Sequence, residues 1–230
     1  MKYCFFKSLF EIFSKRFLFP IKAISRLPKY PLSFIKKLVE GIFGKYFDNL
    51  SKDQNPLFLW IGCADSRVPA EEITHADPGD IFVHRNVANM VVHTDINLLS
   101  VLQYAVEVLE VKHIIVCGHY NCGGVKAAMT NHDFGLINKW LRNIKEVYEK
   151  HYTDLHEIAD ETARFNRLVE LNVAEQIQNL AKTTIVQKAW EKRQFPHLHG
   201  WVFDIHHGEI KEIININAGE WTSPVFHYDF

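Results

Sequence analysis

The chain has 230 residues, of which 47% are apolar and 23% are charged, and its formal net charge is -1. This is an ordinary globular composition, which excludes a largely disordered or collagen-like chain. A nearly neutral chain also lacks the strongly basic surface that nucleic-acid binding requires, so we expect no nucleic-acid partner.

Residues 1–47 differ in composition from the rest, because they are rich in Lys, Arg and Phe and contain few acidic residues. Four phenylalanines share one face of a predicted helix, at intervals of four, three and four: Phe6, Phe10, Phe13 and Phe17. Pro20 ends this helix. The segment is interpreted as a helical arm packed on the body of the protein or on a partner subunit. The alternatives are a mitochondrial presequence and a membrane-surface helix.

Charged residues interrupt every apolar run in this segment, so we expect neither an integral membrane span nor a secretory signal. The expected location is the cytoplasm, or the mitochondrial matrix if residues 1 to about 30 act as a presequence. We place the start of the folded domain at residue 48 and its end at residue 230.

Short apolar runs that end at glycine or polar residues predict buried strands at residues 57–61, 81–83, 113–117 and 201–205. Helical periodicity predicts helices over residues 95–109, 135–150 and 165–193. The first of these helices has Thr94 or Asp95 as its cap. The alternation predicts an α/β fold, with a mainly parallel central sheet flanked by helices. Its ligand site should lie at the carboxyl ends of the strands.

Metal-binding side chains follow two of the predicted strands. Cys63 comes after the first strand, and His119 and Cys122 come after the third. Zinc binds sulfur and nitrogen ligands in a tetrahedron, and three protein ligands leave one position open for water in catalytic sites. A structural site closed by a fourth ligand, such as Asp65, is the alternative.

An acid and a base follow Cys63 at alternate positions, as Asp65 and Arg67. Two thiolates cancel the charge of Zn²⁺, so a well-placed hydrogen-bond acceptor becomes more important for activating water. Asp65, held ionised by Arg67, can accept a hydrogen bond from hydroxide on the metal and orient it. If Arg67 released it, Asp65 could bind the metal and displace water. A purely structural ion pair is the alternative interpretation.

Three sequence blocks resemble the signatures of the β-carbonic anhydrases in order and interval: CADSRV at 63–68, HRNVAN at 84–89 and CGHYNCGG at 117–124. The similarity runs from about residue 48 to residue 210 and includes residues 170–173 and 199–201. It implies one Zn²⁺ per chain, held by Cys63, His119 and Cys122, with Asp65 and Arg67 as the catalytic pair. The implied reaction is the reversible hydration of CO₂ to bicarbonate and a proton through zinc-bound hydroxide.

The resemblance also implies contacts with substrate and with a second subunit. Gly123 and Gly124 are expected to let the backbone approach a bound anion, and Phe82 and Val87 to help line a small CO₂ pocket. The pocket is expected near a subunit boundary, since the family implies a homodimer or a homotetramer.

One branch of the family binds bicarbonate at a second, regulatory site, and this chain resembles that branch at Trp60, Gly62, Val68 and Arg85. Phe203 stands where the branch has Tyr, so we expect a weakened or altered regulatory site. An arginine after a strand end also has a simpler interpretation, because it can cap main-chain carbonyls.

Two other functions stay open at this point: hydrolysis of carbonyl sulfide or carbon disulfide with the same zinc set, and a non-catalytic zinc-containing anion sensor. Cys117 is interpreted as a small buried thiol. Five late histidines are interpreted as surface or hydrogen-bonded residues rather than as a second metal site: His197, His199, His206, His207 and His227.

Overall fold

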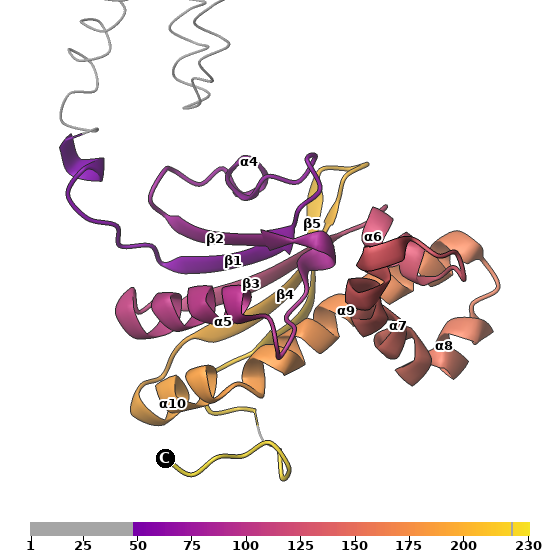
Figure 1. Cartoon of the computed structure of the whole chain (residues 1–230). Coiled ribbons are helices and arrows are strands. Elements are labelled where there is room, and N and C mark those ends of the chain that lie inside the picture. Colours follow the sequence, from indigo (N-terminus) through magenta and orange to yellow (C-terminus); the bar gives the residue numbers. More distant parts are fainter. Residues whose placement is uncertain (1–47, 222) are drawn as a thin grey trace, which may run out of the picture. The chain divides into compact units, whose positions relative to one another are not determined.

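A five-stranded sheet in the order β2-β1-β3-β4-β5 runs through the protein, of which the computed structural model describes residues 48–221 and 223–230 (Figure 1). The strands are β1 (Phe58–Cys63), β2 (Ile81–Asn86), β3 (His113–His119), β4 (His197–Asp204) and β5 (Glu209–Ile216). The first four are parallel, and β5 is antiparallel to β4. The predicted α/β fold with a mainly parallel sheet is confirmed. The helix and the boundary predicted for residues 1–47 lie outside the described residues.

The central strands β1 and β3 are apolar because both of their faces are covered. Their pairing brings the carboxyl ends of neighbouring strands together: Cys63 at the end of β1 is opposite Asn86 in β2, and Gly62 is opposite Cys117 in β3. The predicted ligand-binding edge of the sheet is therefore formed by the residues that end β1, β2 and β3.

The edge strand β5 was not predicted. Its sequence, EIKEIINI, has charged residues among the apolar ones, and most of its side chains are exposed. Without a continuous apolar run, this strand shows no signal of burial on both faces. It pairs with β4, which begins at His197, four residues before the predicted strand.

After residue 53 the α-helices are α4 (Ala70–Thr74), α5 (Ile96–Gln103), α6 (Gly123–Ala128), α7 (Asn138–Lys150), α8 (Tyr152–Glu157), α9 (Glu161–Ala181) and α10 (Thr184–Lys192). The single helix predicted over residues 165–193 is wrong, because Thr183 adopts an extended conformation and caps α10 through its side chain. The helix predicted over 95–109 begins at Asp95, whose carboxylate accepts from two main-chain N–H groups. It ends as the π-helical turn η2 (Tyr104–Val108).

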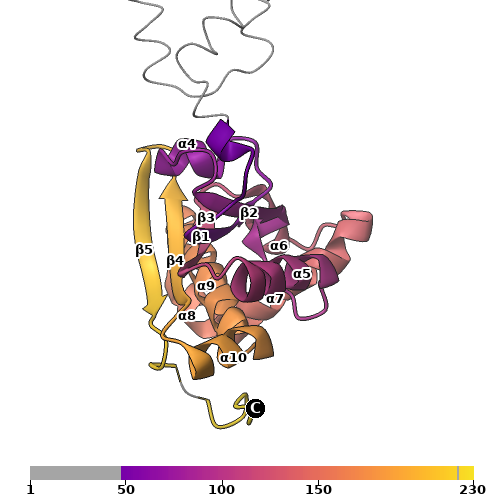
Figure 2. The same cartoon turned by 90° about the vertical axis from the view of Figure 1, so that its left-hand side faces the viewer.

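Helices α5, α9 and α10 pack on one face of the sheet, where β1, β3 and β4 contribute apolar side chains to a shared core (Figures 1 and 2). Helices α6, α7 and α8 pack with α9 in a second core, which includes Cys63 and Cys122. On the other face of the sheet, Trp60, Ile115 and Cys117 pack against α4. No helix in the described part of the chain combines the length and apolar character needed to cross a membrane.

Candidate metal centre

Cys63, His119 and Cys122 meet at the carboxyl ends of β1 and β3. Cys63 ends β1, His119 ends β3, and Cys122 directly precedes α6. Their ligand atoms all lie within 4.8 Å of one another, and all three residues are buried. No other group of three such side chains this close occurs in the described residues. The three ligands predicted from the sequence are thus brought together by the fold.

The spacing of the two sulfurs fits a metal. Their Sγ atoms are 3.9 Å apart. A tetrahedral zinc ion with Zn–S bonds of about 2.3 Å requires a separation of about 3.8 Å. A disulfide would require about 2.05 Å. The separation of the two sulfurs therefore fits two ligands of one tetrahedral ion.

The His119 ring has one nitrogen satisfied and one free. Its Nδ1 lies 2.9 Å from the carbonyl oxygen of Tyr120, so Nδ1 carries the proton and donates to it. The other nitrogen, Nε2, is buried and has no hydrogen-bond partner among the described residues. An unprotonated ring nitrogen directed at two thiols is what a metal ligand requires, and the Nδ1 hydrogen bond fixes this tautomer.

The two thiols shift each other's pKa in opposite directions. The hydrogen bond with Cys122 lowers the pKa of Cys63 despite its burial, and the nearby His119 side chain and the main chain of Asp65 and Ala88 add to this effect. The same hydrogen bond, together with burial, raises the pKa of Cys122. A divalent cation bound by both sulfurs would lower the pKa of both thiols, because it stabilises both thiolates.

Asp65 is held by Arg67 through two nearly parallel hydrogen bonds. Arg67 Nε is 2.9 Å from Asp65 Oδ1, and Arg67 Nη2 is 2.7 Å from Oδ2. The Arg67 guanidinium lowers the pKa of Asp65 well below its usual range, so Asp65 is a carboxylate at neutral pH. Its Oδ2 lies 3.8 Å from His119 Nε2, beside the metal-ligand set. The predicted pair therefore exists and stands next to the three ligands.

Arg85 uses two of its nitrogens on main-chain carbonyls. Its Nε donates to the Cys63 carbonyl at 2.8 Å, and its Nη2 donates to the Asp65 carbonyl at 2.5 Å. This is the capping role given above as the simpler interpretation. The capping also fixes the backbone on both sides of the first ligand.

The Trp60 indole lies over Gly62 on the face of the sheet where α4 packs. A Cβ atom added at Gly62 would lie 2.3 Å from Trp60 Nε1, so only glycine fits there. Trp60 Nε1 is buried and has no hydrogen-bond partner in the described part of the chain. Phe203 packs in the same cluster, and Val68 is buried in the core around the thiols.

The residues expected around the substrate lie in two different parts of the chain's core, one near the thiols and one away from them. Gly124 packs closely against the turn after β2, because an added Cβ would lie 2.9 Å from Val87 Cγ1, whereas the same position at Gly123 is open. Phe82 lies in the first half of β2, opposite Leu59, and its ring is 5.8 Å from that of Tyr104. Within one chain, Val87 is brought to the thiols and Phe82 belongs to the other core.

Cys117 stands apart from the ligand set, in the cluster with Trp60. Its Sγ lies 3.3 Å from the Gly118 carbonyl oxygen, and burial raises the pKa of this thiol. The interpretation of Cys117 as a small buried thiol is confirmed.

Sequence reasoning assigned no role to the residues that support the site from behind. Tyr120 donates from its hydroxyl to Glu170 Oε1 at 2.7 Å, and Lys211 donates to the same oxygen at 2.7 Å. Asn172 of α9 donates to the Ala88 carbonyl at 3.2 Å. Glu170 and Asn172 lie in the ELNV block at residues 170–173. This block is part of the family resemblance, but it does not indicate which groups the two side chains contact.

Comparison with known proteins agrees with this geometry. The sequence model of the family described as Carbonic anhydrase matches residues 58–210. A carbonic anhydrase of Emericella nidulans is 52% identical over 174 residues, which are 76% of this chain and 76% of that protein.

Two solved structures have the same fold. One comes from a study of two tetrameric β-carbonic anhydrases of Sordaria macrospora, with a TM-score of 0.73 and 40% identity over 80% of this chain and 95% of that one. The other is a Coccomyxa β-carbonic anhydrase in complex with acetazolamide, with a TM-score of 0.74 and 38% identity over 81% of this chain and 86% of that one.

The family match spans the four parallel strands whose ends carry the two thiols and the histidine. Similarity of sequence and geometry of the site therefore concern the same part of the molecule. The chain belongs to the β-carbonic anhydrases, which are carbonate dehydratases.

Proposed function

We propose that this chain catalyses the reversible hydration of CO₂ to bicarbonate and a proton, with one Zn²⁺ held by Cys63, His119 and Cys122. The observation that carries the proposal is the buried, unpartnered Nε2 of His119 beside two sulfurs in the described chain. A closed structural site would need a fourth protein ligand, and the acid beside the set, Asp65, is bound instead to Arg67. The arrangement supports a site with one open position.

Bound zinc would supply Lewis-acid chemistry by lowering the pKa of water in that position. Asp65 supplies an ionised acceptor whose two oxygens are fixed by Arg67, so it can accept a hydrogen bond and orient the attacking group. Its lowered pKa means that Asp65 orients and does not carry the proton to solvent near neutral pH. Release of Asp65 by Arg67 would free the carboxylate to close the open position, which gives a self-inhibited state.

Stopped-flow CO₂ hydration combined with metal analysis tests this proposal. We expect one zinc per chain, turnover at alkaline pH and loss of both in Cys63→Ser. One zinc per chain without turnover would instead favour the anion sensor. Turnover of carbonyl sulfide far above that of CO₂ would favour the hydrolase, and an unaffected Cys63→Ser variant would contradict the ligand set.

Bicarbonate regulation is a finer part of the proposal. A buried indole N–H with no partner in the described residues supports an anion near Trp60, and Phe203 provides no hydroxyl to hold it. We expect bicarbonate, at matched ionic strength, to inhibit the wild-type chain less steeply than a Phe203→Tyr variant. Equal inhibition of the two would contradict a weakened regulatory site.

The active unit in this proposal is a homodimer or a homotetramer. The tetrameric state of the Sordaria enzymes supports an assembly. The placement of Phe82 away from the thiols of its own chain is consistent with a CO₂ pocket completed at a subunit boundary.

A further inference from the structure

The segment between β2 and α5 contains a buried turn with an unusual backbone. Ala88 has φ 64° and Asn89 has φ 48°, so two successive residues other than glycine adopt the left-handed conformation. Both residues are buried. Such a conformation persists only where its surroundings determine it.

This turn touches the surroundings of both sulfur ligands. Ala88 packs in the same buried core as Cys63, and its main chain helps to lower the pKa of that thiol. On its other side the turn packs against Gly124, two residues after Cys122, where an added Cβ would lie 2.9 Å from Val87 Cγ1 and 3.3 Å from Ala88 Cβ. A shift of the turn would therefore reach both thiolates.

Side chains, rather than strand or helix partners, hold the backbone of this segment. Asn86 bonds both the N–H and the carbonyl of Met90, at 2.7 and 2.8 Å, and Trp140 Nε1 donates to the Val87 carbonyl at 2.8 Å. These contacts anchor the two ends of the segment. The left-handed residues between them are held from α9.

A chain of three hydrogen bonds makes that connection. Asn172 Nδ2 donates to the Ala88 carbonyl at 3.2 Å, and Asn172 Oδ1 accepts from Gln176 Nε2 at 3.1 Å. Gln176 Oε1 then accepts from the Val91 N–H at 2.7 Å. Both amide side chains are buried, and their spacing of four places them on one face of α9.

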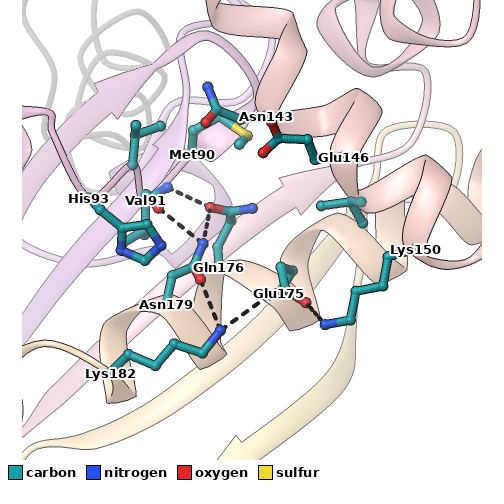
Figure 3. A pocket seen from close by; sticks show the side chains of 12 residues that line it. Met90, Val91, His93, Asn143, Glu146, Lys150, Glu175, Gln176, Asn179 and Lys182 are labelled. Atoms are coloured by element: carbon teal, nitrogen blue, oxygen red, sulfur yellow. Dashed lines mark hydrogen bonds and ion pairs between the residues drawn. The ribbon is translucent and has the colours of Figure 1, made fainter. Parts of the chain in front are cut away.

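The far end of this chain borders a cavity of about 190 Å³ (Figure 3). There Asn179 Nδ2 donates to the Val91 carbonyl at 3.2 Å and lies 3.5 Å from Gln176 Oε1. Figure 3 shows Glu175 beyond it, paired with Lys150 and Lys182 at the rim. Lys182 also donates to Asn179 Oδ1 at 3.4 Å, which connects this charged rim to the network.

We infer that Asn172 and Gln176 are positioning residues for the metal centre. By fixing the Ala88 carbonyl and the Val91 N–H, they hold the left-handed turn in the core around Cys63 and keep Val87 and Ala88 packed on Gly124. The inference rests on the proposed metal site and extends it to α9, which supplies none of the three ligands.

The test uses the full chain with Asn172→Leu, which keeps the volume and removes both hydrogen bonds. Gln187→Leu is the matched control, because Gln187 is a buried amide of α10 that donates to the Ala181 and Phe226 carbonyls, outside the site. Gln176→Met, one hydrogen bond further from the metal, serves if Asn172→Leu does not fold. The readouts are zinc affinity by chelator competition, the sulfur-to-metal absorption bands of the cobalt-loaded protein, and melting temperature.

We expect both leucine variants to lower the melting temperature. Only Asn172→Leu should weaken zinc binding, by about 10- to 100-fold, and shift the cobalt bands. Gln176→Met should change the metal readouts in the same direction by a smaller factor. Metal readouts equal to those of Gln187→Leu, in a wild-type chain that binds zinc and hydrates CO₂, would overturn the positioning role alone. A wild-type chain that binds no zinc would overturn both this inference and the proposed function.

Discussion

The orientation of the Asp65 carboxylate depends on Arg67 and on the backbone that Arg67 contacts. The guanidinium meets both carboxylate oxygens, and Arg67 Nη2 also lies 3.3 Å from the Asn121 carbonyl oxygen, next to the ligand Cys122. Arg67 thus links the acid after the first thiol to the backbone before the second. The carboxylate has one favoured orientation because arginine, unlike lysine, presents a rigid fork of donors.

Arg67→Lys should retain the positive charge and lose this orientation. We expect kcat for CO₂ hydration to fall by about 10- to 100-fold while zinc content stays near one per chain. Stopped-flow kinetics with metal analysis measures both quantities. Arg142→Lys is the control, because Arg142 is an exposed residue of α7 paired with Glu146. An Arg67→Lys variant as active as this control would show that orientation by Arg67 is unnecessary.

The residues to which we assign the chemistry could be identified in the sequence, whereas the residues that support them could not. Cys63, His119 and Cys122 follow strand ends, so fold class alone predicts that they meet. The left-handed Ala88 gave no such signal, since alanine has no preference for positive φ. The sequence also contains no sign that Trp60 Nε1 has no hydrogen-bond partner within residues 48–221 and 223–230, because this depends on which polar groups the fold places near it.

At the scale of elements, α9 connects the sheet, the second core and the back of the metal centre. Its Glu170 accepts from Tyr120, which follows β3, from Lys211 of β5 and from Arg167 of α9 itself. Burial alone would raise the pKa of Glu170, but these three hydrogen bonds outweigh burial and lower the pKa below its ordinary value of 4.5. Glu170 therefore contributes stability in its ionised form.

Glu170→Gln should lower the free energy of unfolding at pH 7 by about 1.5–3 kcal/mol, the range for hydrogen bonds to a charged group. Because the folded pKa is below the unfolded one, this contribution is complete above pH 4.5 and disappears as the pH falls through the folded pKa. Denaturant unfolding at pH 7 and at pH 3 should thus show a smaller difference between wild type and variant at pH 3. Glu146→Gln, on the exposed side of α7, should show little difference at either pH. A Glu170→Gln deficit that is the same at both pH values would contradict an ionised Glu170.

Periodicity gave the types of the main elements but not all of their ends. The break between α9 and α10 falls at Thr183, whose hydroxyl competes for a main-chain N–H, and a threonine inside a helical pattern is not by itself a stop signal. Strand β5 was missed because an edge strand needs no apolar run. In both cases tertiary packing determines where an element begins or ends, and the local sequence pattern does not specify it.

At the scale of the whole molecule, the proposed assembly and the N-terminal segment can be tested separately. The chain has a mass of 26.8 kDa, so light scattering coupled to size-exclusion chromatography should give about twice or four times this value. The measurement belongs on the full chain at the concentration used for kinetics. A fully active protein with the mass of one chain would contradict a CO₂ pocket that needs two subunits.

Whether residues 1–47 are retained or partly removed in the mature protein distinguishes the two proposed locations. Intact-mass analysis of protein from its native source should give a chain that retains this segment if it is a permanent arm and the enzyme is cytoplasmic. Loss of about the first 30 residues would instead indicate a mitochondrial presequence.

The separation of Cys63 and Cys122 along the chain gives the metal site a further effect. The two residues are 59 positions apart, and a single ion that bound both would close the intervening loop, which contains α4, β2, α5 and β3. Closing a loop of this length restricts the unfolded chain, and binding that requires the folded geometry becomes part of the folding free energy. Chelation of the metal should then lower the free energy of unfolding of the whole sheet, in addition to abolishing catalysis.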